Sequence, residues 1–523
     1  FIFKWLYLLL YLLYPLDRRL RLPPKVKHLF LLPQLSLEER DMLGYKYKTD
    51  PYEHQDDALN ICWDKTEYAL FMEMGCGKSK VLLDNIAILY AKGDINAALI
   101  VAPKGVYDNW IEGEIPIHLP DYVERRIYRW SPAETQKNKK QREEILRFSH
   151  DLDFVVMNVE ALSTKKGTDF AVKFLLNKRA LFAVDESTSI KSPSAARTKN
   201  TLRIAKYATH KRILTGSPVT RSPLDLYTQC EFLDPALLGY SSYYSFRARY
   251  AEMVDRSAGG RTFKQVIGYK NLEELNELLQ PFSYRVLKKD CLDLPDKVYI
   301  TRKIEMTPEQ KKAYDEIKRY AITELSNSER VSVTSVITQL LRLHQISCGF
   351  THSDLDKDVE LKSQRLEELM NILEETEGKV IIWANYRFDI KRILKTIADK
   401  YGPESVGAYY GDTSDEERRR ILHDFQDKES KLQYIVGNTQ TGGYGINLTA
   451  AHTVVYYSNN FDLEKRLQSE DRAHRIGQSN KVTYIDIICK NTVDEKIVKS
   501  LKAKQNIASK VLGEEKTWQD WIV

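Results

Sequence analysis

The 523-residue sequence predicts an α/β protein with two lobes, each built on a parallel β-sheet that is flanked by helices. Short apolar segments rich in β-branched residues alternate with helical patterns, and this series occurs twice along the chain. Near-continuous apolar strands that are separated by helices are typical of parallel sheets covered on both faces. The two series therefore indicate two lobes.

Four apolar segments predict the strands of the first lobe: 97–103, 152–158, 180–186 and 212–217. Four more predict the strands of the second lobe: 379–385, 432–438, 452–458 and 482–489. The region of about 225–285 is rich in tyrosine and in helical pattern, so we expect a short helical insertion there. We divide the chain into an extension (1–44), an N-terminal lobe with this insertion (45–290) and a C-terminal lobe (291–523).

The composition is that of an ordinary globular protein. Hydrophobic residues make up 43% and charged residues 29%, which excludes wholesale disorder or a collagen-like chain. The 79 basic and 73 acidic residues give a net charge of +6, which is too small by itself to indicate nucleic-acid binding. The six cysteines are far apart and form no C-x-x-C pair, so we expect a reducing compartment and no structural zinc.

The first 16 residues, FIFKWLYLLLYLLYPL, form an apolar run that only Lys4 interrupts. A membrane span needs about 20 such residues, so we expect no membrane anchor. Residues 1–41 are predicted to be an upstream translated stretch or a lineage-specific extension, with Met42 near the start of the core. The alternative is a helix whose apolar face docks on the core or on a partner.

A phosphate-binding loop is indicated by EMGCGKSK (73–80), between an apolar segment and a helical pattern. Gly75 and Gly77 permit a tight turn whose N–H groups face phosphate oxygens. Lys78 would reach the β- and γ-phosphates, and Ser79 would offer a hydroxyl to Mg²⁺. The first glycine of the full G-x-x-x-x-G-K-S pattern is replaced by Met72, so the motif depends on its strand–loop–helix context.

An acidic pair follows another predicted strand, in VDES (184–187). Asp185 is placed to coordinate Mg²⁺, and Glu186 to orient and deprotonate water. Such a pair alone is more often the start of a helix, but a phosphate loop upstream favours the catalytic interpretation. Gln55, in YEHQ (52–55), carries the donor and acceptor that can read an adenine edge.

The densest group of motifs lies near the C-terminus, in QSEDRAHRIGQ (468–478). A helix there would place Gln468, Arg472 and Arg475 on one face. The arginines are either a surface salt-bridge stripe or arginine fingers directed at a phosphate. The preceding TQTGGYGINLT (439–449) is a glycine-rich loop in which Gly445 permits close backbone approach.

Together these motifs resemble those of the SWI/SNF-type ATPases of helicase superfamily two, from about Tyr47 to about Lys502. The resemblance also covers LIVAPKGVYDNW (99–110), LTGSPVTRSPLDLYTQCEFLDP (214–235) and KVIIWANYRFDI (379–390). It implies two RecA-like lobes with an ATP cleft between them, and a minimal bacterial or phage member of the family. The family's Asp-Glu-Ala-His is Asp185-Glu186-Ser187-Thr188 here, which puts the coupling between motifs in doubt.

The resemblance also implies residue roles. Gln55 corresponds to the adenine contact, and the loop residues Gly75, Cys76, Gly77, Lys78 and Ser79 to the site of ATP and Mg²⁺. Asp185 and Glu186 correspond to the metal-binding and catalytic carboxylates, and Arg472 and Arg475 to the motif-six arginines beside Gln468. Gly445 falls in the loop that links the ATP state to the grip on DNA.

The predicted function is ATP-driven translocation on double-stranded DNA, with backbone contacts, weak sequence preference and a possible directing partner protein. The expected location is the cytoplasm (nucleoid or host-cell cytoplasm), or the nucleus of a eukaryote. Two alternatives remain: a strand-separating or annealing helicase, and an ATP-switched scaffold that binds DNA or a partner.

Overall fold

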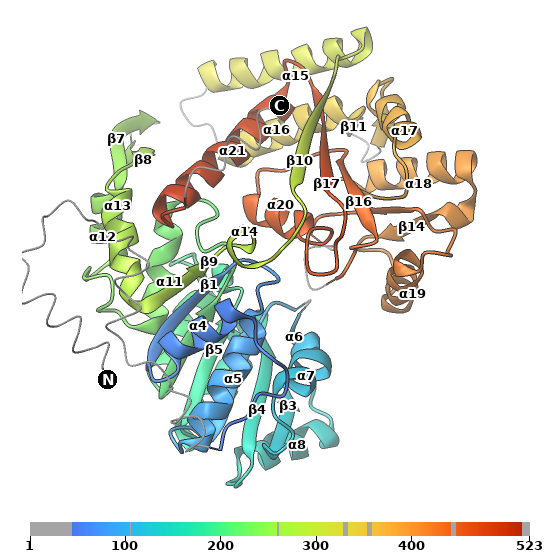
Figure 1. Ribbon diagram of the computed structural model, residues 1–523. Helices are drawn as coiled ribbons and strands as arrows, with labels where there is room; N and C mark the ends of the chain where they lie inside the picture. The colour runs from blue at the N-terminus through green and yellow to red at the C-terminus, as the bar shows by residue number, and fades with distance from the viewer. Residues whose placement is uncertain are drawn as a thin grey trace, which may run out of the picture.

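The computed structural model describes residues 44–104, 106–258, 261–327, 333–352, 358–440 and 446–514. Two parallel β-sheets with flanking helices account for most of these residues, which confirms the predicted fold class (Figure 1). Residues 1–43 of the predicted extension lie outside the described residues. Within the described part of the chain, no helix has the length and apolar character needed to cross a membrane.

The first sheet contains seven parallel strands in the order β3-β4-β2-β5-β6-β1-β9. Their bounds are Glu67–Met72 (β1), Ala97–Ala102 (β2), Arg125–Arg129 (β3), Leu152–Asn158 (β4), Ala180–Asp185 (β5), His210–Leu214 (β6) and Ser283–Val286 (β9). The order places β2, β5, β6 and β1 side by side. The loops that leave their carboxyl ends therefore meet at one edge, where open α/β sheets bind ligands.

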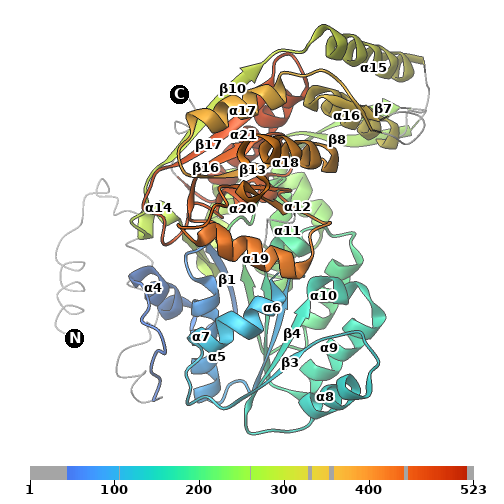
Figure 2. The same cartoon turned by 90° about the vertical axis from the view of Figure 1, so that its right-hand side faces the viewer.

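Alternate residues of each strand in the first sheet pack on opposite helix layers. Leu70 and Met72 pack with α4 (Glu53–Cys62) and α5 (Lys78–Ala91), whereas Ala69 and Phe71 belong to the core that contains α9 (Lys165–Asn177) and α10 (Ala196–Ala205). Figure 2 shows α5 and α9 on opposite sides of the sheet. Burial on both faces explains why these strands are near-continuous apolar runs.

The second sheet contains six parallel strands in the order β10-β17-β16-β13-β15-β14. Their bounds are Lys297–Ile304 (β10), Lys379–Trp383 (β13), Val406–Tyr409 (β14), Tyr434–Gly437 (β15), Ala451–Tyr456 (β16) and Val482–Cys489 (β17). One core joins it to α17 (Arg365–Glu375) and α18 (Arg387–Tyr401), and another to α19 (Asp415–Gln426). The boundary that we propose near residue 290 falls between the last strand of the first sheet and the first strand of the second.

All eight predicted strands are present, with ends that shift by a few residues. Among the strands of the two large sheets, β3, β9, β10 and β14 were not predicted. These strands are short or carry many polar residues, as in RRIYR (β3) and KVYITRKI (β10). All four lie at sheet edges, where one side of the strand has no neighbour to bury it.

The predicted helical insertion over about 225–285 needs one correction. It contains helices α11 (Leu226–Leu233), α12 (Tyr243–Tyr250) and α13 (Leu272–Leu279), but also an antiparallel hairpin of β7 (Ala251–Ala258) and β8 (Arg261–Tyr269). The hairpin is stabilised by pairing between two polar segments, which apolar periodicity does not reveal.

Two segments join the lobes. Helix α14 (Lys288–Cys291) lies between the two sheets, and α21 (Val493–Val511) runs from the second lobe back to the first (Figure 1). Ile497 packs with α15 (Pro308–Asn327) and α16 (Val333–Cys348), whereas Val511 belongs to the core of the first lobe. Beyond the helix, Glu514 accepts a hydrogen bond of 3.0 Å from Arg285 Nε.

Candidate nucleotide-binding site

The phosphate loop connects β1 to α5 at the carboxyl edge of the first sheet. Gly75 and Gly77 have φ angles of 81° and 83°, which favour glycine. A Cβ atom on Gly77 would lie 2.1 Å from Gln55 Nε2, so a side chain there would displace Gln55. Lys78 opens α5, and its Nζ donates to the Met72 carbonyl at 3.2 Å. The loop is thus a tight turn at the start of a long helix, as the sequence predicts.

Gln55 and Cys76 make contacts within the chain. The Gln55 amide donates to the Cys76 carbonyl at 3.2 Å and accepts from the Tyr52 N–H at 3.1 Å. The Cys76 N–H donates to the Glu73 carbonyl at 3.1 Å, and its side chain is buried. In this conformation Gln55 therefore supports the phosphate loop, while one N–H and one lone pair of its amide are not used by these two contacts.

The acidic pair lies at the end of β5. Asp185 accepts hydrogen bonds from Trp110 Nε1 at 2.9 Å and from the Glu186 N–H at 3.0 Å. Glu186 adopts a left-handed backbone conformation with φ of 46°, which is uncommon for a residue other than glycine and is concentrated at functional sites. Its carboxylate accepts a hydrogen bond from Thr215 Oγ1 at 3.1 Å.

Burial shifts the titration of both carboxyl groups. It raises the pKa of Asp185, although Lys78 and the hydrogen bond from Trp110 oppose the shift. Burial also raises the pKa of Glu186 to about 7, where the charge of Lys78 opposes the shift and that of Asp185 adds to it. A carboxylate with this pKa is suited to accept a proton near neutral pH.

Two residues of this site were not identified from the sequence. Trp110 and Glu114 bound a π-helical turn that follows β2, and Trp110 fixes one oxygen of Asp185. Burial and the charge of Asp185 raise the pKa of Glu114, whereas hydrogen bonds from Asn109 and Ser79 lower it. Trp110 ends the quoted segment LIVAPKGVYDNW, but only the strand order shows that this segment lies beside Asp185.

The helix considered over 468–478 reaches only Glu470, where α20 (Leu463–Glu470) ends. Arg472 and Arg475 lie in turns instead, and each donates from Nη1 to the Ile446 carbonyl at 3.3 Å. The two arginines meet at the Ile446 carbonyl because the chain turns after α20, not because they lie on one face of a helix. Gln468 is fully buried in α20, and Gly445 lies outside the described residues.

The arginine segment of the second lobe lies against the phosphate loop of the first. A Cβ atom on Gly75 would lie 4.0 Å from Arg475 Cβ. Lys288 Nζ bonds to Asp471 and donates to the His474 carbonyl at 2.6 Å. Because Lys288 belongs to α14, this helix connects the phosphate loop to the second lobe.

A second polar contact joins the lobes beside the acidic pair. Glu464 of α20 accepts hydrogen bonds from Thr188 Oγ1 at 2.7 Å and from Lys191 Nζ at 2.9 Å. Although burial opposes it, the charge of Lys191 lowers the pKa of Glu464, as do the bonds from Lys191 and Thr188. Thr188, which stands in place of the family's histidine, thus links the acidic segment to the second lobe.

A phosphate loop, an acidic pair and two arginines, brought together by two parallel-sheet lobes, define the class of helicase-related ATPases. The chain belongs to the SNF2 family within this class. The model of the SNF2-related domain matches residues 54–352, which is more than half of the chain, and that of the helicase conserved C-terminal domain matches residues 361–477. The predicted family is therefore confirmed.

Curated relatives are similar over most of this chain. An uncharacterized ATP-dependent helicase of Mycoplasma pneumoniae is 25% identical over 85% of this chain and 40% of its own length. The putative ATP-dependent helicase/translocase YwqA of Bacillus subtilis is 26% identical over 86% of this chain and 46% of its own length. The ISWI chromatin-remodeling complex ATPase ISW1 of Saccharomyces cerevisiae is 25% identical over 89% of this chain and 41% of its own length. This chain thus spans less than half the length of each of these relatives.

Among solved structures, the Sulfolobus solfataricus SWI2/SNF2 ATPase core in complex with dsDNA matches with a TM-score of 0.40 and 23% identity. The match covers 90% of this chain and 95% of that chain.

Proposed function

We propose that this protein is a DNA-dependent ATPase that couples ATP hydrolysis to translocation on double-stranded DNA. The main support is the contact between the two halves of the candidate site, because Arg475 of the second lobe lies against Gly75 of the phosphate loop. A site divided between two lobes changes with their relative position, which is what a motor requires.

The phosphate loop would hold the triphosphate. Its backbone from Gly75 to Gly77 and the Lys78 ammonium would bind phosphate oxygens, and the start of α5 favours negative charge there. Gln55 would read the adenine with the N–H and the lone pair that its contacts to Cys76 and Tyr52 leave.

Ser79 and Asp185 would hold Mg²⁺, which supplies charge neutralisation at the phosphates. Their surroundings fit a divalent cation, because three carboxyl groups (Glu114, Asp185 and Glu186) meet here and burial raises the pKa of each of them. Glu186 would orient the attacking water and take its proton, while Thr215 holds one carboxylate oxygen in place. Arg472 and Arg475 would stabilise the charge that develops on the phosphoryl group.

Double-stranded DNA is the proposed track. The names of the matched relatives, a helicase/translocase and a chromatin-remodeling ATPase, support this choice. Contacts to phosphates would give weak sequence preference and strong salt dependence. Gly445 would belong to the loop that links nucleotide state to DNA grip, and a partner protein could direct the motor.

The test compares phosphate release with duplex DNA, single-stranded DNA, RNA and no polymer at fixed salt. We expect the largest stimulation by duplex DNA and displacement of a triplex-forming strand without separation of the duplex. Lys78→Ala is the matched control and should lose turnover under all four conditions. Stimulation only by RNA would exclude a DNA motor, and separation of forked strands without triplex displacement would identify an unwinding helicase instead.

A further inference from the structure

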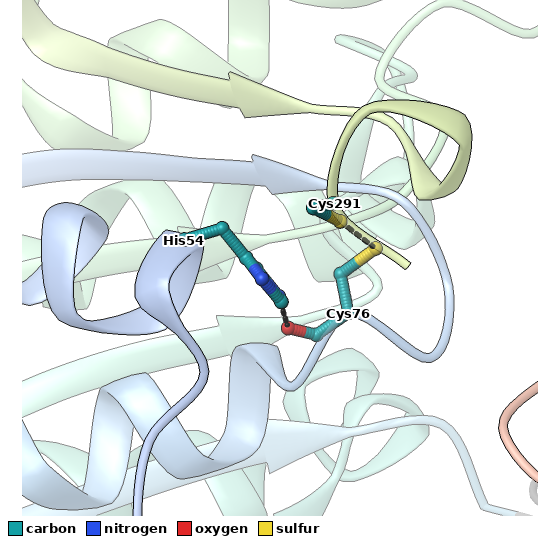
Figure 3. Close-up of side chains that lie close together, drawn as sticks. All are labelled: His54, Cys76 and Cys291. Atoms are coloured by element: carbon teal, nitrogen blue, oxygen red, sulfur yellow. Dashed lines mark hydrogen bonds between the residues drawn. The ribbon is translucent and has the colours of Figure 1, made fainter. Parts of the chain in front are cut away.

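Three side chains with metal-binding chemistry meet behind the phosphate loop. Figure 3 shows His54 from α4, Cys76 from the loop and Cys291 from α14 directed toward one another. The two sulfur atoms are 3.7 Å apart, and the possible ligand atoms of all three residues lie within 4.8 Å of one another. Cys76 and Cys291 are 215 positions apart in the sequence, so only the fold brings them together.

The distance between the two sulfur atoms fits a shared metal ion better than a disulfide. Tetrahedral coordination with metal–sulfur bonds of about 2.3 Å separates two thiolate ligands by about 3.8 Å. A disulfide requires about 2.05 Å, so the sulfurs would have to approach by about 1.7 Å. The thiols already have the separation that one tetrahedral ion imposes.

His54 is oriented as a third ligand. Its Nε2 lies 2.9 Å from the Cys76 carbonyl, so donation of that N–H leaves a lone pair on Nδ1. A tetrahedral site places nitrogen and sulfur ligands about 3.6 Å apart, and the possible ligand atoms here lie within 4.8 Å of one another, so a small movement of the imidazole completes the set. Three protein ligands leave one position for water.

The charges of such a site cancel. Burial raises the pKa of the Cys76 and Cys291 thiols, so each retains its proton when no metal is bound. Binding of one divalent cation would release both thiol protons to solvent and form two metal–sulfur bonds. Two thiolates, one neutral imidazole and one divalent cation sum to zero, which suits a buried position. The partly exposed Cys291 provides the side from which the ion enters.

We propose that His54, Cys76 and Cys291 form a binding site for Zn²⁺ or another thiophilic divalent cation. Soft thiolate ligands select such ions over Mg²⁺, so this site is distinct from the one proposed at Ser79 and Asp185. An ion bound here would fix the phosphate loop to α4 and to α14, the helix that carries Lys288 to the second lobe. The consequence for nucleotide binding rests on the proposed function, whereas metal binding itself does not.

The test is titration of the reduced full chain with Co²⁺ in the absence of nucleotide, followed by absorption spectroscopy. We expect one equivalent to bind, with thiolate-to-cobalt charge-transfer bands and the intense visible bands of tetrahedral Co²⁺, and one equivalent of Zn²⁺ to remove them. Cys291→Ala and Cys76→Ala should each weaken binding by about 100-fold. The matched control is Cys230→Ala, a buried cysteine in the core of the first lobe, which should bind as the unaltered chain does.

Absence of the charge-transfer bands in the unaltered chain would overturn the proposal, as would their persistence in both Cys291→Ala and Cys76→Ala. Unchanged affinity in His54→Phe would overturn the three-ligand site. Rapid cross-linking of Cys76 to Cys291 by diamide in a chain that binds no Co²⁺ would show a redox pair instead. Because no nucleotide is present, a chain without ATPase activity that binds Co²⁺ would still support the site.

Discussion

The first lobe holds its acidic pair with hydrogen bonds from its own segments, whereas the second lobe uses its two arginines to hold its own loop. Trp110 and Thr215 fix the carboxylates of Asp185 and Glu186. Arg472 and Arg475 instead donate to the Ile446 carbonyl. The carboxylates of the first half are therefore held in place, whereas in the proposed motor a phosphate would compete with a carbonyl for the two arginines of the second half.

This difference suggests that the second lobe is the part of the proposed motor that rearranges during the ATPase cycle. In the proposed motor, the fixed carboxylates of the first lobe would need little reorganisation when nucleotide binds. The arginines would act after a rearrangement of the second lobe, and the segments that hold them are bonded to the first lobe through Lys288 and Glu464. Three substitutions and a pH profile test this difference between the lobes.

The largest effect is expected for Glu186→Gln in the first half of the site. Loss of the base should reduce turnover by about 10⁴-fold, because proton transfer from water then has no acceptor. ATP binding should persist, since Lys78 and the glycines are intact. Phosphate release and binding of a fluorescent ATP analogue measure the two effects separately. Full turnover in this variant would show that Glu186 is not the general base.

Arg475→Ala should reduce DNA-stimulated turnover by about 10³-fold, at the lower end of the effect of an arginine finger, because Arg472 remains beside it. Nucleotide affinity should change little if the second half acts only after rearrangement. Arg420→Ala, on the exposed side of α19, is the matched control. Stimulation equal to that of the unaltered chain would show that Arg475 serves only to hold the loop.

Glu464→Gln should lower DNA-stimulated turnover by about tenfold, because it weakens a charge-assisted contact to Lys191 and Thr188. Turnover without DNA should be nearly unchanged, since no group of the first half is altered. The ratio of stimulated to basal phosphate release is the measurement. In a double-mutant cycle with Thr188→Val, the losses of stimulated turnover should be non-additive. Additive losses would show that the two residues act independently.

The smallest effect concerns pH. Because the pKa of Glu186 is raised to about 7, the deprotonated fraction that acts as a base falls as pH falls. We expect kcat/KM for ATP to decrease about threefold from about pH 7.5 to about pH 6.5. Glu186→Asp, which retains a carboxylate, should keep a pH dependence, whereas residual activity of Glu186→Gln should lose it. A flat profile in the unaltered chain would contradict a titrating base.

Much of the fold could be predicted because its information is local. The eight assigned strands are apolar on both faces, so each is visible in its own residues. The strands that were missed, such as β3 and β10, carry polar residues at sheet edges, and the β7–β8 hairpin depends on pairing between two polar segments. The end of α20 at Glu470 was missed because Asp471 and His474 are held by Lys288 of another segment.

The candidate site divides in the same way. Contiguous motifs identified the phosphate loop, the acidic pair and the two arginines. Trp110 and Glu114 could be identified only once the order of strands β2 and β5 was known. The contact of Thr188 with Glu464 could be identified only once the position of the second lobe was known.

The sequence alone determined the two lobes, the family and the residue types that an ATPase site needs, because apolar periodicity and contiguous motifs act over a few neighbouring residues. Only the tertiary structure decided which distant residues meet. The cysteine spacing predicts no structural zinc, yet the fold brings Cys76 and Cys291 to 3.7 Å beside His54. Such contacts depend on how strands and helices pack into layers, and no spacing along the chain encodes that distance directly.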